Sequence, residues 1–362
     1  MHNIILLIIA CLAFIAPPDV LARTAAMQQR CDSCHTMHNS QNATDDLTGI
    51  GPLEALLTST CYGCHGNAGF IADQGPGVTP YVWQTSPNAV YSGGSKNTLA
   101  GGDFYWVSPA GGGIDSKGHN VEGIGSQGPR TAPGGTEFFD ASRPLRCAGA
   151  DGCHGDRSKS NEIVAMSRGH HGDDGTTIDG NTVATSYRFL LGVVGYEDPD
   201  WEFTSSNADH NQYKGFLRAN DSPVALVPPV SSQPTISNFC SGCHGDFHNN
   251  GSGAGAGVVD GPMTNPWIRH PVDYGMGSLG GEYAGYGGVS NDYVVDTPLA
   301  SEDVTASVPK STNLTADADT IVMCLSCHRA HGSPNDAILR WDYQSWPGGG
   351  YNGCGDCHTE KI

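Results

Sequence analysis

The stretch that decides the fold is Cys324-Leu325-Ser326-Cys327-His328, near the carboxyl end of a chain of 362 residues. Two cysteines separated by two residues, with a histidine directly after the second, recur along the chain. The five regular copies are Cys31, Cys34 and His35; Cys61, Cys64 and His65; Cys240, Cys243 and His244; Cys324, Cys327 and His328; and Cys354, Cys357 and His358. A sixth, stretched copy has five residues between Cys147 and Cys153, and His154 follows. Of the 13 cysteines, all but Cys11 belong to these six motifs.

This spacing is typical of covalent haem attachment. Two thiols one helical turn apart can add to the two vinyl groups of a haem, and the following histidine then lies beneath the ring as an iron ligand. A structural zinc site needs four ligands and does not explain a histidine after every pair. A thioredoxin-like motif accounts for one pair only, and a lone disulfide is the alternative for Cys147 and Cys153. We therefore predict six c-type haems, each with its motif histidine as proximal ligand.

Eight further histidines are candidates for the second axial position. They are His38, His119, His170, His171, His210, His248, His270 and His331. Six-coordinate irons with two imidazoles each would need six of them. Three of the candidates follow a motif histidine by three or four residues and project from the same side of the backbone, so each is expected to ligate a neighbouring haem. These three are His38, His248 and His331.

The remaining candidates lie outside the motifs. His119 and His270 lie in segments that contain glycine or proline, where an imidazole can reach a ring from elsewhere in the chain. One of His170, His171 or His210 would supply the sixth ligand, and the sequence does not choose among them. Methionine is the alternative axial ligand and raises the reduction potential, but the abundance of histidine favours pairs of imidazoles.

The composition points away from a conventional globular protein. The chain has 37 acidic and 18 basic side chains, for a net charge of −19, which argues against nucleic acid because such binding depends on basic residues. An acidic chain should also favour ferric iron, so low reduction potentials are expected. With 50 glycines and 22 prolines, the backbone is expected to be ordered but rich in loops.

The predicted fold is a multihaem cytochrome whose polypeptide wraps a continuous stack of six haems. Roughly 57 residues are available for each haem, too few for a separate apolar core around each ring. We therefore expect mostly irregular coil with short helices and few strands. Short helices are predicted at 53–57 and 161–168, and 187–194 is predicted to be helix or strand.

The amino-terminal segment predicts export. An apolar run at 4–16 precedes Val20-Leu21-Ala22, the small-residue ending typical of a signal-peptidase site. The run is shorter than the roughly 20 apolar residues of a membrane-spanning helix. We expect residues 1–22 to be a signal peptide and 23–362 to be a single hexahaem domain, secreted to the extracellular space or the cell surface.

Several segments carry a family resemblance. They include Cys34-His35-Thr36-Met37-His38, Lys117-Gly118-His119-Asn120, Arg269-His270-Pro271 and Cys324-Leu325-Ser326-Cys327-His328-Arg329-Ala330-His331. In this order they resemble segments of the hexahaem extracellular c-type cytochromes that form conducting filaments. The resemblance implies six haems with two histidine ligands each, in a continuous stack. It also implies that His38 ligates, in the adjoining subunit, the fifth haem, which is held by Cys324, Cys327 and His328.

The leading functional hypothesis is a non-enzymatic subunit of a head-to-tail homopolymer. Heterologous contacts that do not close generate open filaments, and such a filament would pass electrons from redox partner cytochromes to external acceptors. A monomeric periplasmic or outer-surface shuttle is the first alternative. The second is a multihaem reductase of a small oxyanion, which needs an open iron position; eight further histidines give no sign of one.

Overall fold

The structure is a computed structural model that describes part of the chain. The described residues are 34–35, 54–66, 80–86, 99–171, 178–199, 201–202, 205–217, 233–245, 270, 272–277, 279–304, 309–310, 312, 314, 316–345 and 350–360. The predicted signal peptide, Cys31, His38 and His248 lie outside the described residues.

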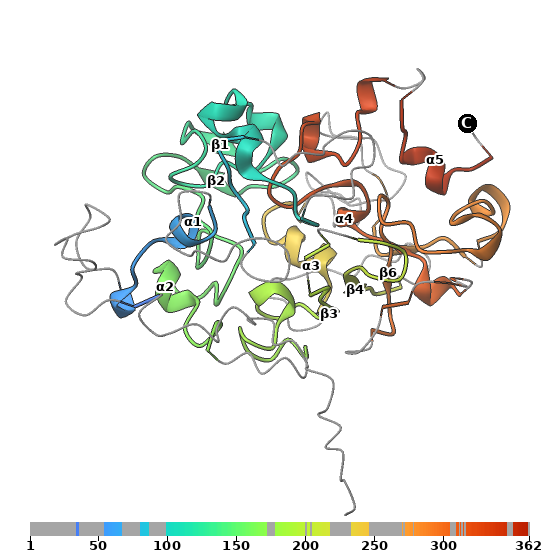
Figure 1. Cartoon of the computed structure of the whole chain (residues 1–362), viewed down its shortest axis with the longest axis horizontal. Helices are drawn as coiled ribbons and strands as arrows, with labels where there is room; N and C mark the ends of the chain where they lie inside the picture. The colour runs from blue at the N-terminus through green and yellow to red at the C-terminus, as the bar shows by residue number, and fades with distance from the viewer. Residues whose placement is uncertain are drawn as a thin grey trace, which may run out of the picture.

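The α-helices of the described residues are short, and most coincide with the cysteine motifs (Figure 1). Each of α1 (Cys61–Cys64), α4 (Cys324–Cys327) and α5 (Cys354–Cys357) is a single turn that begins and ends at a motif cysteine. α3 (Ile236–Ser241) includes the first cysteine of the fourth motif. α2 (Glu162–Ala165) lies within the predicted helix at 161–168. No helix of the described residues is long and apolar enough to span a bilayer.

Short 3-10 turns make up most of the remaining helical structure. They are η3 (Glu54–Leu56), η4 (Phe104–Val107), η5 (Pro109–Gly111), η6 (Asp115–Lys117), η7 (Tyr187–Phe189), η9 (Gly281–Tyr283), η10 (Gly288–Ser290), η11 (Asp317–Asp319), η12 (Asp336–Ile338) and η13 (Tyr343–Ser345). The predicted helix at 53–57 is thus the turn η3, and the segment 187–194 begins with the turn η7.

The strands are two or three residues long. β1 (Arg130–Thr131) and β2 (Phe138–Phe139) form an antiparallel pair, and a five-stranded sheet has the order β3-β4-β6-β7-β5. The strands of this sheet are β3 (Gly195–Tyr196), β4 (Gln212–Lys214), β5 (Tyr274–Gly275), β6 (Ala300–Ser301) and β7 (Ile321–Val322). Only the β4–β6 pair is parallel, with Tyr213 opposite Ala300. Together with the short helices, these strands confirm the predicted coil-rich fold.

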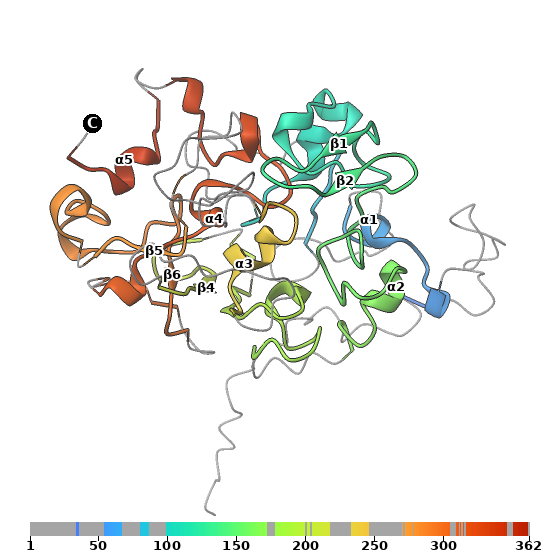
Figure 2. The same cartoon turned by 180° about the vertical axis from the view of Figure 1, so that it is seen from behind.

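Apolar side chains gather in small separate clusters. One lies around Tyr213 and Ile321 beside the five-stranded sheet, a second around Tyr286, and a third around Val107. In both views α1, α3, α4 and α5 follow one another along the long axis in chain order (Figures 1 and 2). The motifs are therefore distributed along the length of the molecule instead of surrounding one core.

Candidate haem-binding site

The regular motifs close by one backbone hydrogen bond. In the four regular motifs that the structure describes in full, the N–H of the motif histidine donates to the carbonyl of the first cysteine. The donor-to-acceptor distances are 2.8 Å for His65 and Cys61, 3.0 Å for His244 and Cys240, 3.1 Å for His328 and Cys324, and 2.9 Å for His358 and Cys354. This helical closure holds both thiols and the imidazole on one turn of backbone, as attachment of one haem requires.

The stretched motif restores the same closure. The N–H of His154 donates to the carbonyl of Cys147 at 2.9 Å, so the three additional residues form an excursion without moving the histidine away from the first cysteine. The loop is tight, since a Cβ added at Gly152 would lie 2.6 Å from backbone atoms of Ala148. The Glu162 carboxylate accepts hydrogen bonds from the N–H groups of Cys147 and Ala148 at 2.8 and 3.2 Å. The third motif therefore shares the closing hydrogen bond of the regular ones.

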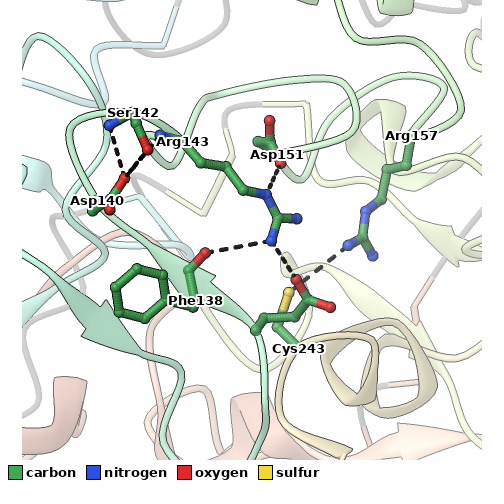
Figure 3. A network of polar contacts seen from close by, with 8 residues as sticks. Phe138, Asp140, Ser142, Arg143, Asp151, Arg157 and Cys243 are labelled. Atoms are coloured by element: carbon green, nitrogen blue, oxygen red, sulfur yellow. Dashed lines mark hydrogen bonds and ion pairs between the residues drawn. The ribbon is translucent and has the colours of Figure 1, made fainter.

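Arg143 forms a hydrogen bond to the loop at 148–152 between the two cysteines of the stretched motif (Figure 3). The Arg143 guanidinium donates to Asp151 at 2.6 Å and to Glu137 at 3.0 Å. Nearby, Arg157 donates to the Cys243 sulfur at 3.8 Å, which links the third and fourth motifs. The loop is thus held from both sides, by Arg143 outside and by Glu162 at its first residue.

Five motif histidines each face a second imidazole. The ring centroids are 5.9 Å apart for His35 and His171, 6.3 Å for His65 and His170, 6.3 Å for His154 and His331, 6.1 Å for His244 and His119, and 6.1 Å for His358 and His270. Two imidazoles that bind one metal ion from opposite sides, through bonds of about 2.0 Å, have centroids roughly 6 Å apart. The residues present therefore fit five irons, each with two histidine ligands.

The remaining candidates are placed differently. The structure brings both His170 and His171 to motif histidines, whereas His210 stacks on Tyr293 at 3.5 Å between centroids and 4° between ring planes. Among the described residues, His328 is not paired with a second imidazole. His331 stands beside His154 and not beside its own motif histidine, the arrangement expected for a side chain one turn further along.

Burial keeps several of the facing imidazoles neutral, which is the form that binds iron. Burial and the nearby His154 lower the pKa of His331 to about 3. Burial and the nearby His244 lower the pKa of His119 to about 4, and burial with His65 has the same effect on His170. These side chains are therefore available as ligands without the loss of a proton at neutral pH.

The Nδ1 atoms of the motif histidines have acceptors that orient the rings. Five bond to backbone carbonyls: His35 to Ala55 at 2.9 Å, His65 to Pro80 at 3.1 Å, His154 to Arg188 at 2.8 Å, His244 to Pro133 at 2.7 Å and His328 to Ala337 at 2.7 Å. The sixth, His358, bonds to the Glu282 carboxylate at 3.2 Å. A hydrogen bond at Nδ1 leaves Nε2 free for the iron.

These acceptors are functional groups that the sequence analysis missed. At the first, third and fifth motifs the acceptor residue has a left-handed backbone, with φ of 57° at Ala55, 48° at Arg188 and 56° at Ala337. A left-handed backbone is uncommon for residues with a side chain. The sequence does contain a signal for these three acceptors, because each is followed by an apolar residue and then by leucine.

Thiols of successive motifs lie close together. The Cys61 and Cys147 thiols lie within 4.8 Å of each other, and the neighbouring Cys324 thiol raises the pKa of Cys240, so the second motif adjoins the third and the fourth adjoins the fifth. The first and second motifs, the third and fourth, and the fifth and sixth are also neighbours. Burial, followed by the charge of a cysteine in the adjoining motif, raises the pKa of one thiol in each of these pairs. Cys34 acts on Cys64, Cys243 on Cys153 and Cys327 on Cys357. Each motif is therefore a neighbour of the next in sequence.

Known proteins share these motifs. A family model described as the doubled CXXCH motif matches residues 318–362. The C-type cytochrome OmcS of Geobacter sulfurreducens is 29% identical over 365 aligned residues, which cover 86% of this chain and 78% of the relative. The chain is a homologue of OmcS. This homology confirms the family resemblance and, with the CXXCH motifs, identifies c-type haem as the cofactor.

Two solved structures of OmcS are similar to this chain. One is described as an outer membrane cytochrome S filament and the other as OmcS nanowires, both from Geobacter sulfurreducens. Each is 22% identical to this chain, and the TM-scores are 0.45 and 0.44. The matches cover 89% and 87% of this chain and 85% and 84% of the OmcS chains.

Proposed function

We propose that this chain is the subunit of an extracellular filament that carries electrons between six c-type haems, each with two histidine ligands. The supporting observation is the set of five imidazole pairs, each at the separation that one iron requires. The close approach of successive motifs supports a continuous path, because electrons would pass from each haem to its neighbour in sequence. The filament assignment also rests on the homology to OmcS.

The chain supplies partner histidines in a regular order at alternate motifs. The first motif's His35 faces His171, which follows the third motif. The third motif's His154 faces His331, which follows the fifth motif. At these haems, the second ligand therefore comes from the segment after the motif two places further along the chain, 17 residues after His154 in one case and three after His328 in the other.

Continuing this order, the fifth motif's His328 requires a histidine that follows a seventh motif. In a head-to-tail homopolymer, the next motif but one is the first motif of the adjoining subunit. His38 follows His35 by three residues, as His331 follows His328. We propose that His38 ligates the fifth haem of the adjoining subunit, so that assembly of the filament and completion of the haem chain are one event.

The test compares two histidine variants of secreted protein. We expect His38→Ala to give monomers by electron cryomicroscopy and size-exclusion chromatography, with about one sixth of the haem iron becoming high-spin. His248→Ala is the matched control and should still form filaments with low-spin haems. Filaments of His38→Ala with all haems low-spin would contradict the proposal, and loss of the low-spin signal in His248→Ala alone would assign the fifth haem to His248.

The number of haems and the site of cleavage are tested by intact mass. We expect a mature chain that begins after Ala22 and carries six added haem masses, one of them on the Cys147 and Cys153 motif. Five haems would remove the third motif from the path. A monomeric wild type with six low-spin haems would favour the electron shuttle, and filaments with a large high-spin fraction would favour the oxyanion reductase.

A further inference from the structure

The sixth motif differs from the other five in the group that accepts the hydrogen bond from the motif histidine. Its histidine, His358, bonds through Nδ1 to a side-chain carboxylate oxygen of Glu282 at 3.2 Å, whereas every other motif histidine bonds to a backbone carbonyl. A carbonyl carries a partial charge and a carboxylate a full negative charge. A bound iron would therefore receive more electron density through the imidazole of His358 than through an imidazole whose Nδ1 bonds to a carbonyl.

The local fold fixes Glu282 in this position. The backbone carbonyl of Glu282 accepts hydrogen bonds from the N–H and the hydroxyl of Thr359, the residue after His358, at 2.8 and 3.0 Å. The Thr359 hydroxyl in turn accepts from the Gly285 N–H at 3.0 Å. The Tyr283 ring packs against the His358 ring, with centroids 5.7 Å apart. Turn η9 and the end of the chain thus form one unit around the proximal imidazole.

Burial strengthens the interaction. The side chains of His358 and Glu282 are 30% and 27% exposed, so water screens the contact only in part. His358 also faces the imidazole of His270, as a haem with two histidine ligands requires. The hydrogen bond to the carboxylate would therefore act on an iron held by both His358 and His270.

Several other charges near the motifs point in the same direction, whereas the Glu162 carboxylate at the third motif lies 3.8 Å from the Arg146 guanidinium, which offsets its charge in part. The sixth motif contains a second acid, Asp356, whose carboxylate accepts from Thr297 at 2.9 Å. The third and fourth motifs have Arg157 beside the Cys243 sulfur. At the fifth motif, the Arg340 guanidinium donates to the carbonyl of Leu325 at 2.7 Å. Negative charge stabilises ferric iron and positive charge stabilises ferrous iron.

We propose that Glu282 acts through His358 to make the sixth haem the lowest in reduction potential of the six. This inference rests on the proposed attachment of a haem to Cys354 and Cys357. Reduction adds one electron to the iron, from ferric to ferrous, and no bond to Glu282 forms or breaks. Glu282 is a positioning residue, because it touches the iron ligand and not the iron. The sixth haem would be the last to be reduced and the strongest reductant in the subunit.

The test is a reductive titration of the assembled cytochrome with dithionite, followed by haem absorbance. Glu282→Gln keeps an acceptor for Nδ1 and removes the charge. We expect the lowest midpoint to rise by about 59 mV, which is a tenfold change in a one-electron reduction equilibrium, with the other midpoints unchanged. Electron paramagnetic resonance should show altered g-values for one low-spin ferric haem. If Glu282 had only a structural role, these g-values would be the same as in wild type. Glu282→Asp retains the charge and should keep the lowest midpoint below that of Glu282→Gln.

Asp303→Asn provides the matched control for a change of one charge. Asp303 is 72% exposed and pairs with Lys310, so its removal should shift no midpoint measurably. Movement of a higher midpoint in Glu282→Gln, or no movement in a variant that keeps all six haems, would overturn the inference. A wild type without a haem on Cys354 and Cys357 would instead refute the proposed function at this motif. Intact mass distinguishes these two failures.

Discussion

Removal of the His331 imidazole should open one iron and leave the others intact. His331 faces His154 at 6.3 Å, and burial with nearby His154 lowers its pKa to about 3. In His331→Ala the third haem loses its second ligand, so about one sixth of the haem iron should change from low-spin to high-spin. The deleted ring also leaves a gap beside Phe104, whose centroid lies 4.7 Å from that of His331. Deletion of a large buried side chain costs about 2–5 kcal/mol of folding free energy.

Electron paramagnetic resonance of the ferric protein measures the high-spin fraction, and intact mass establishes that all six haems remain. His210→Ala is the matched control, since His210 is also buried but stacks on Tyr293 and does not face a motif histidine. His331→Met should remain low-spin because the thioether can bind the iron, and the potential of the third haem should then rise. A fully low-spin His331→Ala protein, or an equal high-spin fraction in His210→Ala, would refute the assignment.

Two further predictions concern the stretched motif and acid stability. Gly152→Ala should lower haem attachment at the third motif, because the new Cβ would lie 2.6 Å from the Ala148 backbone. Intact mass should then show a species with five haems. Gly128→Ala is the control, since a Cβ at that position has ordinary contacts, and it should keep all six haems. Burial lowers the pKa of His210 to about 4, so the unfolded chain binds the proton more readily, and the stability that the neutral form contributes should be complete above about pH 6.5 and lost as the pH falls toward 4. As the pH falls across this range, the unfolding free energy should fall less in His210→Gln than in wild type. An equal fall in both proteins would contradict this prediction.

The attachment chemistry could be predicted from the sequence because it depends on local spacing. A pair of cysteines followed by histidine specifies the turn, and the structure has that turn at α1, α4 and α5. The fold class also followed, since a chain with about 57 residues for each haem cannot build a separate core around each one. The third motif is recognisable as a stretched copy, but its spacing does not reveal the hydrogen bond that closes it, which joins residues seven apart.

The pairing of the histidines could not be predicted from local spacing. His331 and His154 are 177 positions apart in the sequence, and only the path of the chain brings them together. The choice among His170, His171 and His210 was equally a matter of long-range packing. The Nδ1 acceptors were missed because most are backbone carbonyls, which every residue possesses. Their placement depends on backbone conformation, such as the left-handed turn at Ala337.

The alternation of Nδ1 acceptors along the chain defines a modular unit. Left-handed residues serve the first, third and fifth motifs, while Pro80 and Pro133 serve the second and fourth. The natural building block is therefore a pair of motifs and not a single one. The second ligands cross between these pairs, as His171 does for His35, so neighbouring pairs depend on one another. Glu282 breaks this alternation at the sixth motif, where a side-chain carboxylate takes the place of a backbone carbonyl.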